Sequence, residues 1–231
     1  MAIHQNSVKC TICEKRSTCF NELGNMDPDL LLSNRLEIKF RKGEIICKQG
    51  TFASNISYIY SGLAKAYLET ETGKHVIINV IPEGQMIALP ALFSHKTYPY
   101  SAAALEDCIL CALDIHVIEE YMRSNGSYAS GIIRILNNYT LNNYNRYLSI
   151  TQKNMDGRLA DLLIYLSEKV YNKHKFYLSL SRTDMAELTH MSPESITRIL
   201  AGFKKSRLIR ISDKELEIKN LKKLKTLGYH A

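Results

Sequence analysis

The stretch SRTDMAELTHMSPESITRILAGFKK, residues 181–205, decides the fold of this chain. Thr183–Leu188 has the apolar spacing of a short helix, and a tight Thr-His-Met link separates it from Ser192-Pro-Glu-Ser195. Serine favours the N-cap of a helix, proline its first position and glutamate its first turn, so a second helix starts here. Two short helices joined in this way are typical of a helix-turn-helix.

The second helix has an apolar face and a polar face that begins at its exposed start. The apolar positions are Ile196, Ile199, Leu200 and Phe203, and the polar ones are Ser192, Glu194, Thr197 and Arg198. In a DNA major groove, arginine contacts guanine, glutamate accepts from cytosine and threonine touches the thymine methyl group. Lys204, Lys205 and Arg207 suit phosphates. The pattern predicts a surface that reads DNA bases.

The residues that follow predict a wing and a basic C-terminal region. Leu208–Ile211, a turn at Asp213-Lys214 and Glu215–Ile218 have the pattern of a hairpin. The segment 198–231 holds ten lysines and arginines and three acids, a net charge of 10 − 3 = +7. The net charge of the whole chain is also +7. A basic end on a neutral body indicates a polyanionic partner, and nucleic acid is the commonest.

The segment 36–114 predicts a small β-roll. Glycines separate its Ile-, Val- and Tyr-rich stretches at intervals that suit short antiparallel strands. These glycines are Gly43, Gly50, Gly62, Gly73 and Gly84.

A long helix is expected next, because Gly131 and Gly157 enclose a glycine-free stretch with heptad spacing. The seam residues are Ile132, Leu136, Tyr139, Asn143, Arg146 and Ile150. We interpret this seam as the interface of a homodimer, with packing on the chain's own β-roll as the alternative. The expected fold class is therefore α+β, in four segments: the N-terminal segment 1–24, a β-roll over 25–126, the long helix over 127–155 and the winged helix-turn-helix over 156–231.

Cysteines suggest a metal centre at the opposite end of the chain. Cys10, Cys13 and Cys19 form a C-x2-C-x5-C motif, and Cys108 and Cys111 follow far downstream. Thiolates favour zinc or iron-sulfur clusters over hard cations. The start of the chain is polar and no apolar run could span a bilayer, so we expect a cytoplasmic protein without a membrane partner. In that reducing compartment, metal binding or redox chemistry is favoured over disulfides.

An enzyme is not expected from the pattern of ionisable residues. The histidines are scattered without a neighbouring nucleophile or base, at His75, His95, His116, His174 and His190 among others.

The order of β-roll, long helix and winged helix-turn-helix resembles the Crp/Fnr family of bacterial transcription regulators. Arg41–Gly50 is similar to the family's first barrel turn, and Pro193–Leu200 is similar to its recognition helix. By this resemblance, the family's base-reading Glu, Ser and Arg correspond to Glu194, Thr197 and Arg198 of this sequence. It implies a homodimer on palindromic DNA with a TTGA-like half-site, and RNA polymerase as a partner.

The resemblance also separates the possible effectors. Cyclic nucleotide binding in the family uses an arginine on the phosphate, and this chain has no arginine between Arg41 and Arg123. The cysteine motif is instead similar to that of the oxygen-sensing Fnr branch. This implies a [4Fe-4S] cluster on Cys10, Cys13, Cys19 and Cys111, with Cys108 as a spare thiol. The alternatives are zinc on the same four ligands, redox-active free thiols, and another small molecule in the β-roll.

Overall fold

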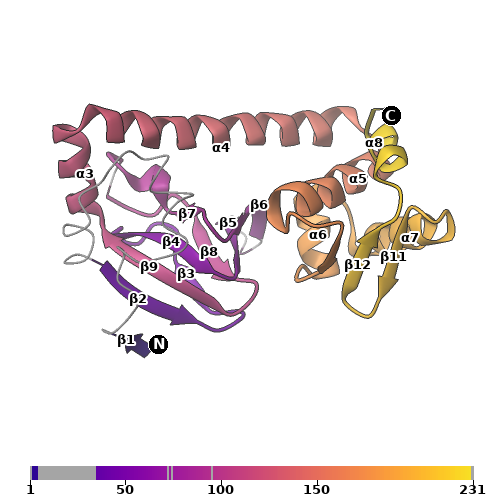
Figure 1. The fold of residues 1–231 in the computed structure, drawn as a ribbon, viewed down its shortest axis with the longest axis horizontal. Coiled ribbons are helices and arrows are strands. Elements are labelled where there is room, and N and C mark those ends of the chain that lie inside the picture. The colour runs from indigo at the N-terminus through magenta and orange to yellow at the C-terminus, as the bar shows by residue number, and fades with distance from the viewer. Residues whose placement is uncertain (1, 5–34, 72, 74, 95, 230–231) are drawn as a thin grey trace. The chain divides into compact units, whose positions relative to one another are not determined.

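The computed structural model describes residues 2–4, 35–71, 73, 75–94 and 96–229. The chain divides into two compact units: unit 1 comprises Met1–Lys74 and Asn79–Thr140, and unit 2 comprises His75–Ile78 and Leu141–Ala231. Figure 1 shows the β-rich first unit, the long helix and the helical second unit with its small sheet. The predicted fold class is confirmed.

Two antiparallel sheets form the β-roll; their strands belong to unit 1, except that the strand residues His75–Ile78 are assigned to unit 2. Their strands are β1 (Ala2–His4), β2 (Arg35–Phe40), β3 (Ile45–Cys47), β4 (Asn55–Ser61), β5 (Leu63–Glu69), β6 (His75–Pro82), β7 (Met86–Ile87), β8 (Ser101–Ala104) and β9 (Cys108–Asp114). One sheet has the order β1-β2-β9-β4-β7, and the other has the order β3-β8-β5-β6. A 3-10 turn, η2 (Leu89–Ala91), follows β7.

The turn between β4 and β5 depends on a glycine. Gly62 has a φ of +99°, and a Cβ atom there would lie 2.5 Å from the carbonyl oxygen of Asp107 and 2.8 Å from Cys108 Sγ. Only a residue without a side chain fits this close approach of two backbones.

Two helices cover the first sheet. α3 (Ile115–Ser124) starts at Asp114, whose side chain caps the helix by accepting from the backbone N–H of His116, and α4 (Gly126–Gln152) follows. Their buried residues form one hydrophobic cluster with the sheet, which includes Tyr58, Met86, Cys111, Ile118, Tyr128 and Ile132.

Unit 2 contains the winged helix-turn-helix. Its elements are α5 (Met155–Tyr165), the π-helical turn η3 (Leu166–Val170), β10 (Lys175–Tyr177), α6 (Arg182–Thr189), α7 (Pro193–Lys205), β11 (Ile209–Ser212), β12 (Glu215–Ile218) and α8 (Leu221–Tyr229). α5 packs against α6, α7 and α8. None of the described helices is long and apolar enough to cross a membrane.

The helix starts in unit 2 follow from local capping chemistry. Ser181 and Asp184 form a reciprocal capping box at α6, and Ser192 accepts from the N–H of Ser195 at α7, where Pro193 is the first helical residue. The apolar face of α7 is buried as its spacing predicts, through Ile196, Ile199, Leu200 and Phe203.

Candidate DNA interface and sensor site

The exposed start of α7 carries the residues that the sequence assigns to base reading. Glu194, Thr197 and Arg198 lie at relative positions 0, 3 and 4 of this helix, so they share one face. All three are exposed. The structure thus brings the three predicted readers together on a rigid element beside a capped helix start.

Hydrogen bonds at α7 determine which groups Glu194 and Thr197 can present to a DNA base. Glu194 is fully exposed, and hydrogen bonds from its own backbone N–H and from the Ser192 side chain hold its pKa below the usual value. It is therefore an ionised acceptor. The Thr197 hydroxyl donates to the carbonyl of Pro193 at 2.9 Å, which commits its proton within the helix. Thr197 can still present its methyl group and an oxygen lone pair to a base.

The wing has three strands, one more than the sequence predicts. β10 pairs with β12, and β12 pairs with β11, whose hairpin turns at Asp213 and Lys214 as expected. Lys214 Nζ lies 6.0 Å from the ring centre of the exposed Tyr177 on β10. At three residues, β10 is too short to give a periodic signal, so sequence reasoning missed both it and Tyr177.

Both acids of β12 are paired with lysines. Glu215 lies 3.0 Å from Lys175, and Glu217 lies 2.7 Å from Lys219, whose hydrogen bond lowers the pKa of Glu217. These pairs offset the negative charge of the strand.

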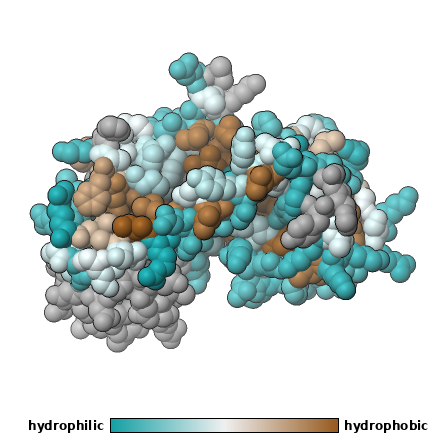
Figure 2. Space-filling model, turned by 90° about the horizontal axis from the view of Figure 1, so that it is seen from above, coloured by the Kyte–Doolittle hydropathy of each residue, from teal (hydrophilic) through white to brown (hydrophobic). Residues whose placement is uncertain are grey.

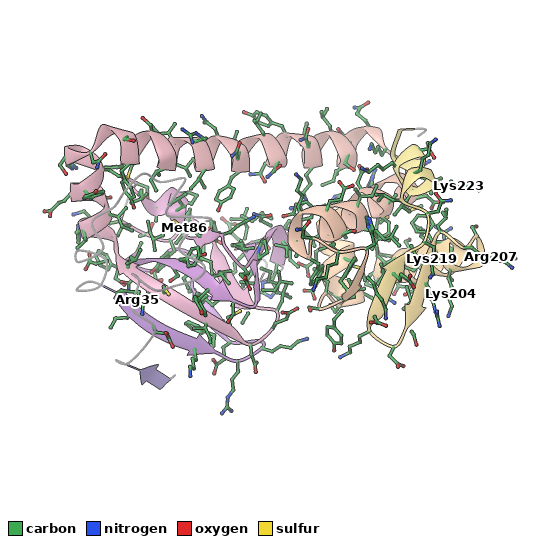
Figure 3. All side chains as sticks on the ribbon, viewed as in Figure 1. Arg35, Met86, Lys204, Arg207, Lys219 and Lys223 are labelled. Atoms are coloured by element: carbon green, nitrogen blue, oxygen red, sulfur yellow. The ribbon has the colours of Figure 1, made fainter. Side chains whose placement is uncertain are left out.

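Cys111 lies on the sheet face that packs against α3 and α4. Tyr58 on β4 and Glu37 on β2 are its direct cross-strand neighbours. The Nη1 atom of Arg35 lies 3.8 Å from Cys111 Sγ, and Figure 3 shows Arg35 at its place on β2. The Cys111 side chain is 6% exposed and belongs to the hydrophobic cluster of unit 1.

Cys108 has a different environment. It is three residues from Cys111 in β9, and an odd spacing in a strand places two side chains on opposite faces. Its thiol donates to the carbonyls of Leu63 at 3.3 Å and Glu106 at 3.2 Å, and burial raises its pKa to about 11. Cys108 therefore behaves as a neutral structural thiol.

Cys47 is similar to Cys108. Its thiol donates to the carbonyl of Tyr100 at 3.8 Å, and burial raises its pKa to about 11.

The three N-terminal cysteines, Cys10, Cys13 and Cys19, lie outside the described residues. Within the described part of the chain, no group of three histidine, cysteine or acidic side chains could hold a metal ion.

The backbone register relates His4, the last described residue before the cysteine motif, to Cys111. His4 on β1 is opposite Glu37 on β2, which is opposite Cys111 on β9, so the three form one cross-strand row. Two strand spacings amount to about 10 Å, and the six residues from His4 to Cys10 can span roughly 20 Å. That length exceeds the distance from His4 to Cys111, and the Cys111 sulfur faces a cationic donor. This part of the site fits a thiolate-bound metal centre.

The predicted helix seam requires a correction in α4. Ile132 is fully buried in the cluster of unit 1, and Leu136 and Tyr139 pack against the same cluster. These side chains face their own β-roll, so Ile132 is not available to a second subunit. The exposed apolar side chains of α4 are Ile133, Leu141, Tyr144, Tyr147 and Leu148.

The exposed set lies on a different face of α4 from the predicted seam. Ile133 is one residue from Ile132, which corresponds to about 100° around a helix. From there, steps of four and three pass through Asn137 and reach Leu141, Tyr144 and Leu148. Figure 2 looks down on the molecule from above the view of Figure 1 and shows brown, hydrophobic side chains between hydrophilic ones.

The remaining seam residues belong to unit 2. Asn143 is exposed and Ile150 is half-buried. Arg146 is turned into its own unit, where it donates to the carbonyls of Ile77 at 2.6 Å, Ile78 and Leu188 at 3.2 Å. Burial lowers its pKa. Within the chain, Arg146 is thus held by backbone carbonyls, and its place in a dimer seam stays a prediction.

Comparisons with known proteins match both parts of the chain. Residues 37–125 match the cyclic nucleotide-binding domain, and residues 157–227 match the Crp-like helix-turn-helix domain.

Curated relatives match along almost the whole chain. Electron transport regulator A of Shewanella oneidensis is 26% identical over 97% of this chain and 92% of its own length. The fumarate and nitrate reduction regulatory protein of Yersinia pestis is 25% identical over 96% of this chain and 91% of its own.

Solved structures show the same fold. FixK2 from Bradyrhizobium japonicum has a TM-score of 0.78 and 17% identity, covering 84% of this chain and 98% of that one. A CooA mutant from Carboxydothermus hydrogenoformans has a TM-score of 0.72 and 19% identity, covering 91% and 95%.

Proposed function

Because this chain is a member of the Crp/Fnr family of DNA-binding transcription regulators, we propose that it senses oxygen or redox state through a [4Fe-4S] cluster. The proposed ligands are Cys10, Cys13, Cys19 and Cys111. We further propose that the cluster controls dimerisation and the binding of a palindromic promoter site.

The observation that carries this proposal is the position of Cys111. Its sulfur lies on the face of β9 that packs against α3 and α4, in the cross-strand row that continues to the backbone of His4. Cys108 lies on the opposite face, and its thiol is occupied by two carbonyls. Cys111 is therefore the better fourth ligand.

The names of relatives support the choice of signal. The matched proteins include an anaerobic regulatory protein of Aggregatibacter actinomycetemcomitans, 23% identical over 94% of this chain, besides the fumarate and nitrate reduction regulator. An effector that binds through a guanidinium and a phosphate has less support, because no arginine lies between Arg41 and Arg123.

When bound, an iron-sulfur cluster supplies an oxygen-sensitive link between the N-terminal segment and β9. The protein's own part is to transmit the presence of that link. Cys111 packs in one cluster with Ile132 and Ile135 of α4. A displacement of β9 at Cys111 therefore shifts the position of the helix as well. The Arg35 guanidinium donates toward the sulfur and stabilises its negative charge.

The dimer interface is proposed on the exposed face of α4, at Ile133, Leu141, Tyr144 and Leu148. This face has few large apolar residues and includes Asn137, so pairing of two copies is weak. A weak interface suits a switch, because a local change of a few kcal/mol can then move the equilibrium.

In the proposed dimer, the two α7 helices lie about one DNA turn, 34 Å, apart and read a palindrome. Arg198 contacts guanine, Glu194 cytosine and Thr197 thymine, while Lys204 and Lys205 contact phosphates. Ser192 caps the helix and holds Glu194 in place. RNA polymerase is the proposed protein partner at the promoter.

Zinc on the same four cysteines is the second candidate, since four thiolates also suit a structural zinc site. Elemental analysis of protein purified without oxygen separates the two. Iron and sulfide in near-equal amounts support the cluster, whereas zinc without iron or sulfide rejects it.

A further inference from the structure

Arg146 on α4 joins two elements that are far apart in the sequence, β6 and α6. Its guanidinium donates to the carbonyls of Ile77 at 2.6 Å and of Ile78, and its Nε atom donates to the carbonyl of Leu188 at 3.2 Å. Ile77 and Ile78 lie on β6, and Leu188 lies on α6. All four residues belong to unit 2. One side chain therefore holds a strand and a helix together.

The α6 end of this contact lies just before the turn of the helix-turn-helix. The last carbonyls of an α-helix lack donors within the helix, and Leu188 is the second-last residue of α6. A cation there also interacts favourably with the helix dipole. His190 follows with a left-handed φ of +55°, and Ser192 then caps α7. The carbonyl that Arg146 binds is thus four positions before the N-cap of the base-reading helix.

The turn itself is short and is closed by the backbone. The N–H of Met191 donates to the carbonyl of Ala186 at 2.9 Å, and α6 packs against α7. Such a connection leaves the two helices little freedom to move separately. A displacement of Leu188 therefore also displaces the start of α7, where the base-reading residues lie.

The β6 end of the contact belongs to a strand that is divided between the two units. His75–Ile78 are assigned to unit 2, and the same strand continues in unit 1 from Asn79 to Pro82. β6 is also the last strand in the order of its sheet, and an edge strand has backbone groups available to other partners. A shift of β6 along its length is therefore passed by the backbone to the carbonyls that Arg146 binds.

Stability alone does not account for an arginine at this position. The side chain is half-buried, and burial lowers its pKa. No ion pair between described residues includes Arg146. Withdrawing a charge from water without an acid to pair it is costly. The arginine is better explained by its rigid fork of donors, which reaches three carbonyls on two elements at once.

We propose that Arg146 is a positioning residue, which makes the placement of α7 depend on the position of β6. It acts through Leu188 and the turn, without contacting DNA itself. The inference deepens the proposed function, because it rests on base reading by α7 and supplies a route by which the β-roll controls that reading. It does not require the cluster.

The test uses the variant Arg146→Met, which keeps an unbranched side chain and removes all of its donors. Under anaerobic conditions, the affinities for a palindromic duplex and for a duplex of random sequence and equal length give the discrimination. We expect this discrimination to fall about tenfold, because base contacts need a fixed α7 whereas phosphate contacts tolerate displacement. Hydrogen exchange should rise at the amides of 76–79 and 188–192. The dimer fraction in sedimentation should remain that of wild type.

Two further variants make the test specific. Arg146→Lys retains the charge but reaches fewer carbonyls, so it should recover part of the discrimination. Arg158→Met is the matched control, because Arg158 is also half-buried in unit 2 and donates from Nε to a backbone carbonyl, that of Lys153 at 2.9 Å. This acceptor lies on neither β6 nor α6. The control should discriminate between the duplexes like wild type.

Wild-type discrimination in Arg146→Met overturns the inference, and so does an equal loss in Arg158→Met. A loss that accompanies a lower dimer fraction overturns it in favour of a place for Arg146 in the dimer seam. Should Arg146→Met fail to fold, Arg146→Lys decides, and wild-type discrimination with wild-type exchange at 188–192 then overturns the inference. A wild-type chain that does not distinguish the two duplexes contradicts the proposed base reading itself.

Discussion

The guanidinium of Arg35 lies 3.8 Å from the sulfur of Cys111, 76 positions further along the chain. Arg35 lies on β2 and Cys111 on β9, and these strands are neighbours in the sheet. A cationic donor beside a sulfur stabilises its thiolate form, which is the form that binds metals. Of the described cysteines, Cys47 and Cys108 instead donate to backbone carbonyls.

The two cysteines of β9 should differ in metal binding. Cys111→Ser removes a proposed ligand, so protein purified without oxygen should lose its iron, sulfide and brown absorbance. Cys108→Ser is the matched control, because the Cys108 thiol donates to two backbone carbonyls. This variant should leave the iron content unchanged. Equal iron content in both variants would contradict the assignment of Cys111.

Arg198→Ala should relax base preference at one position of each half-site. Loss of a bidentate contact to guanine costs about 1–3 kcal/mol, and only on the specific sequence. Lys205→Ala, a phosphate contact, should weaken specific and random DNA alike. Binding isotherms on both duplexes measure the difference, and equal losses from Arg198→Ala on both would reject its role as a base reader.

Leu148→Glu should shift the protein toward monomer. A carboxylate on the exposed apolar face of α4 would be buried without a partner in the proposed dimer. Asn142→Glu is the control, because Asn142 is exposed and lies about 120° around the helix from Leu148. Sedimentation of anaerobic protein measures the dimer fraction. If both variants keep the wild-type fraction, α4 does not pair through this face.

Gly62→Ala should destabilise unit 1 by about 3 kcal/mol. A Cβ atom there meets the Asp107 carbonyl at 2.5 Å and adds the strain of a positive φ. Gly43 also has a positive φ, +88°, but has open space around it, so Gly43→Ala should cost only about 1 kcal/mol. Urea unfolding of both variants gives the two values. Similar losses would show that the close approach to Asp107 is unimportant.

Local signals explain why much of unit 2 could be predicted from the sequence. Ser192 and Pro193 define a helix start within three residues, and the turn at Asp213 lies between two alternating strands. Such signals depend on neighbours in the chain. β10 is different, because its three residues become a strand only through pairing with β12.

The α4 seam shows where sequence reasoning reaches its limit. Ile132 and Ile133 are equally apolar, and heptad steps can be counted from either. Which one is buried depends on how the helix packs against the sheet, which periodicity alone does not contain. The contacts of Arg146 could not be predicted from the sequence either. Its partners are backbone carbonyls, which every residue has, so no residue type marks them. The contact of Arg35 with Cys111 likewise depends on strand pairing between distant segments.

The central claim is that an oxygen-sensitive cluster on the four cysteines controls DNA binding. Binding of a palindromic duplex should be measured on one anaerobic sample before and after exposure to air, with its absorbance followed in parallel. The account predicts brown protein that binds before exposure, and a loss of binding that follows the bleaching. Colourless protein that contains zinc, and binds the duplex equally in both states, would contradict it.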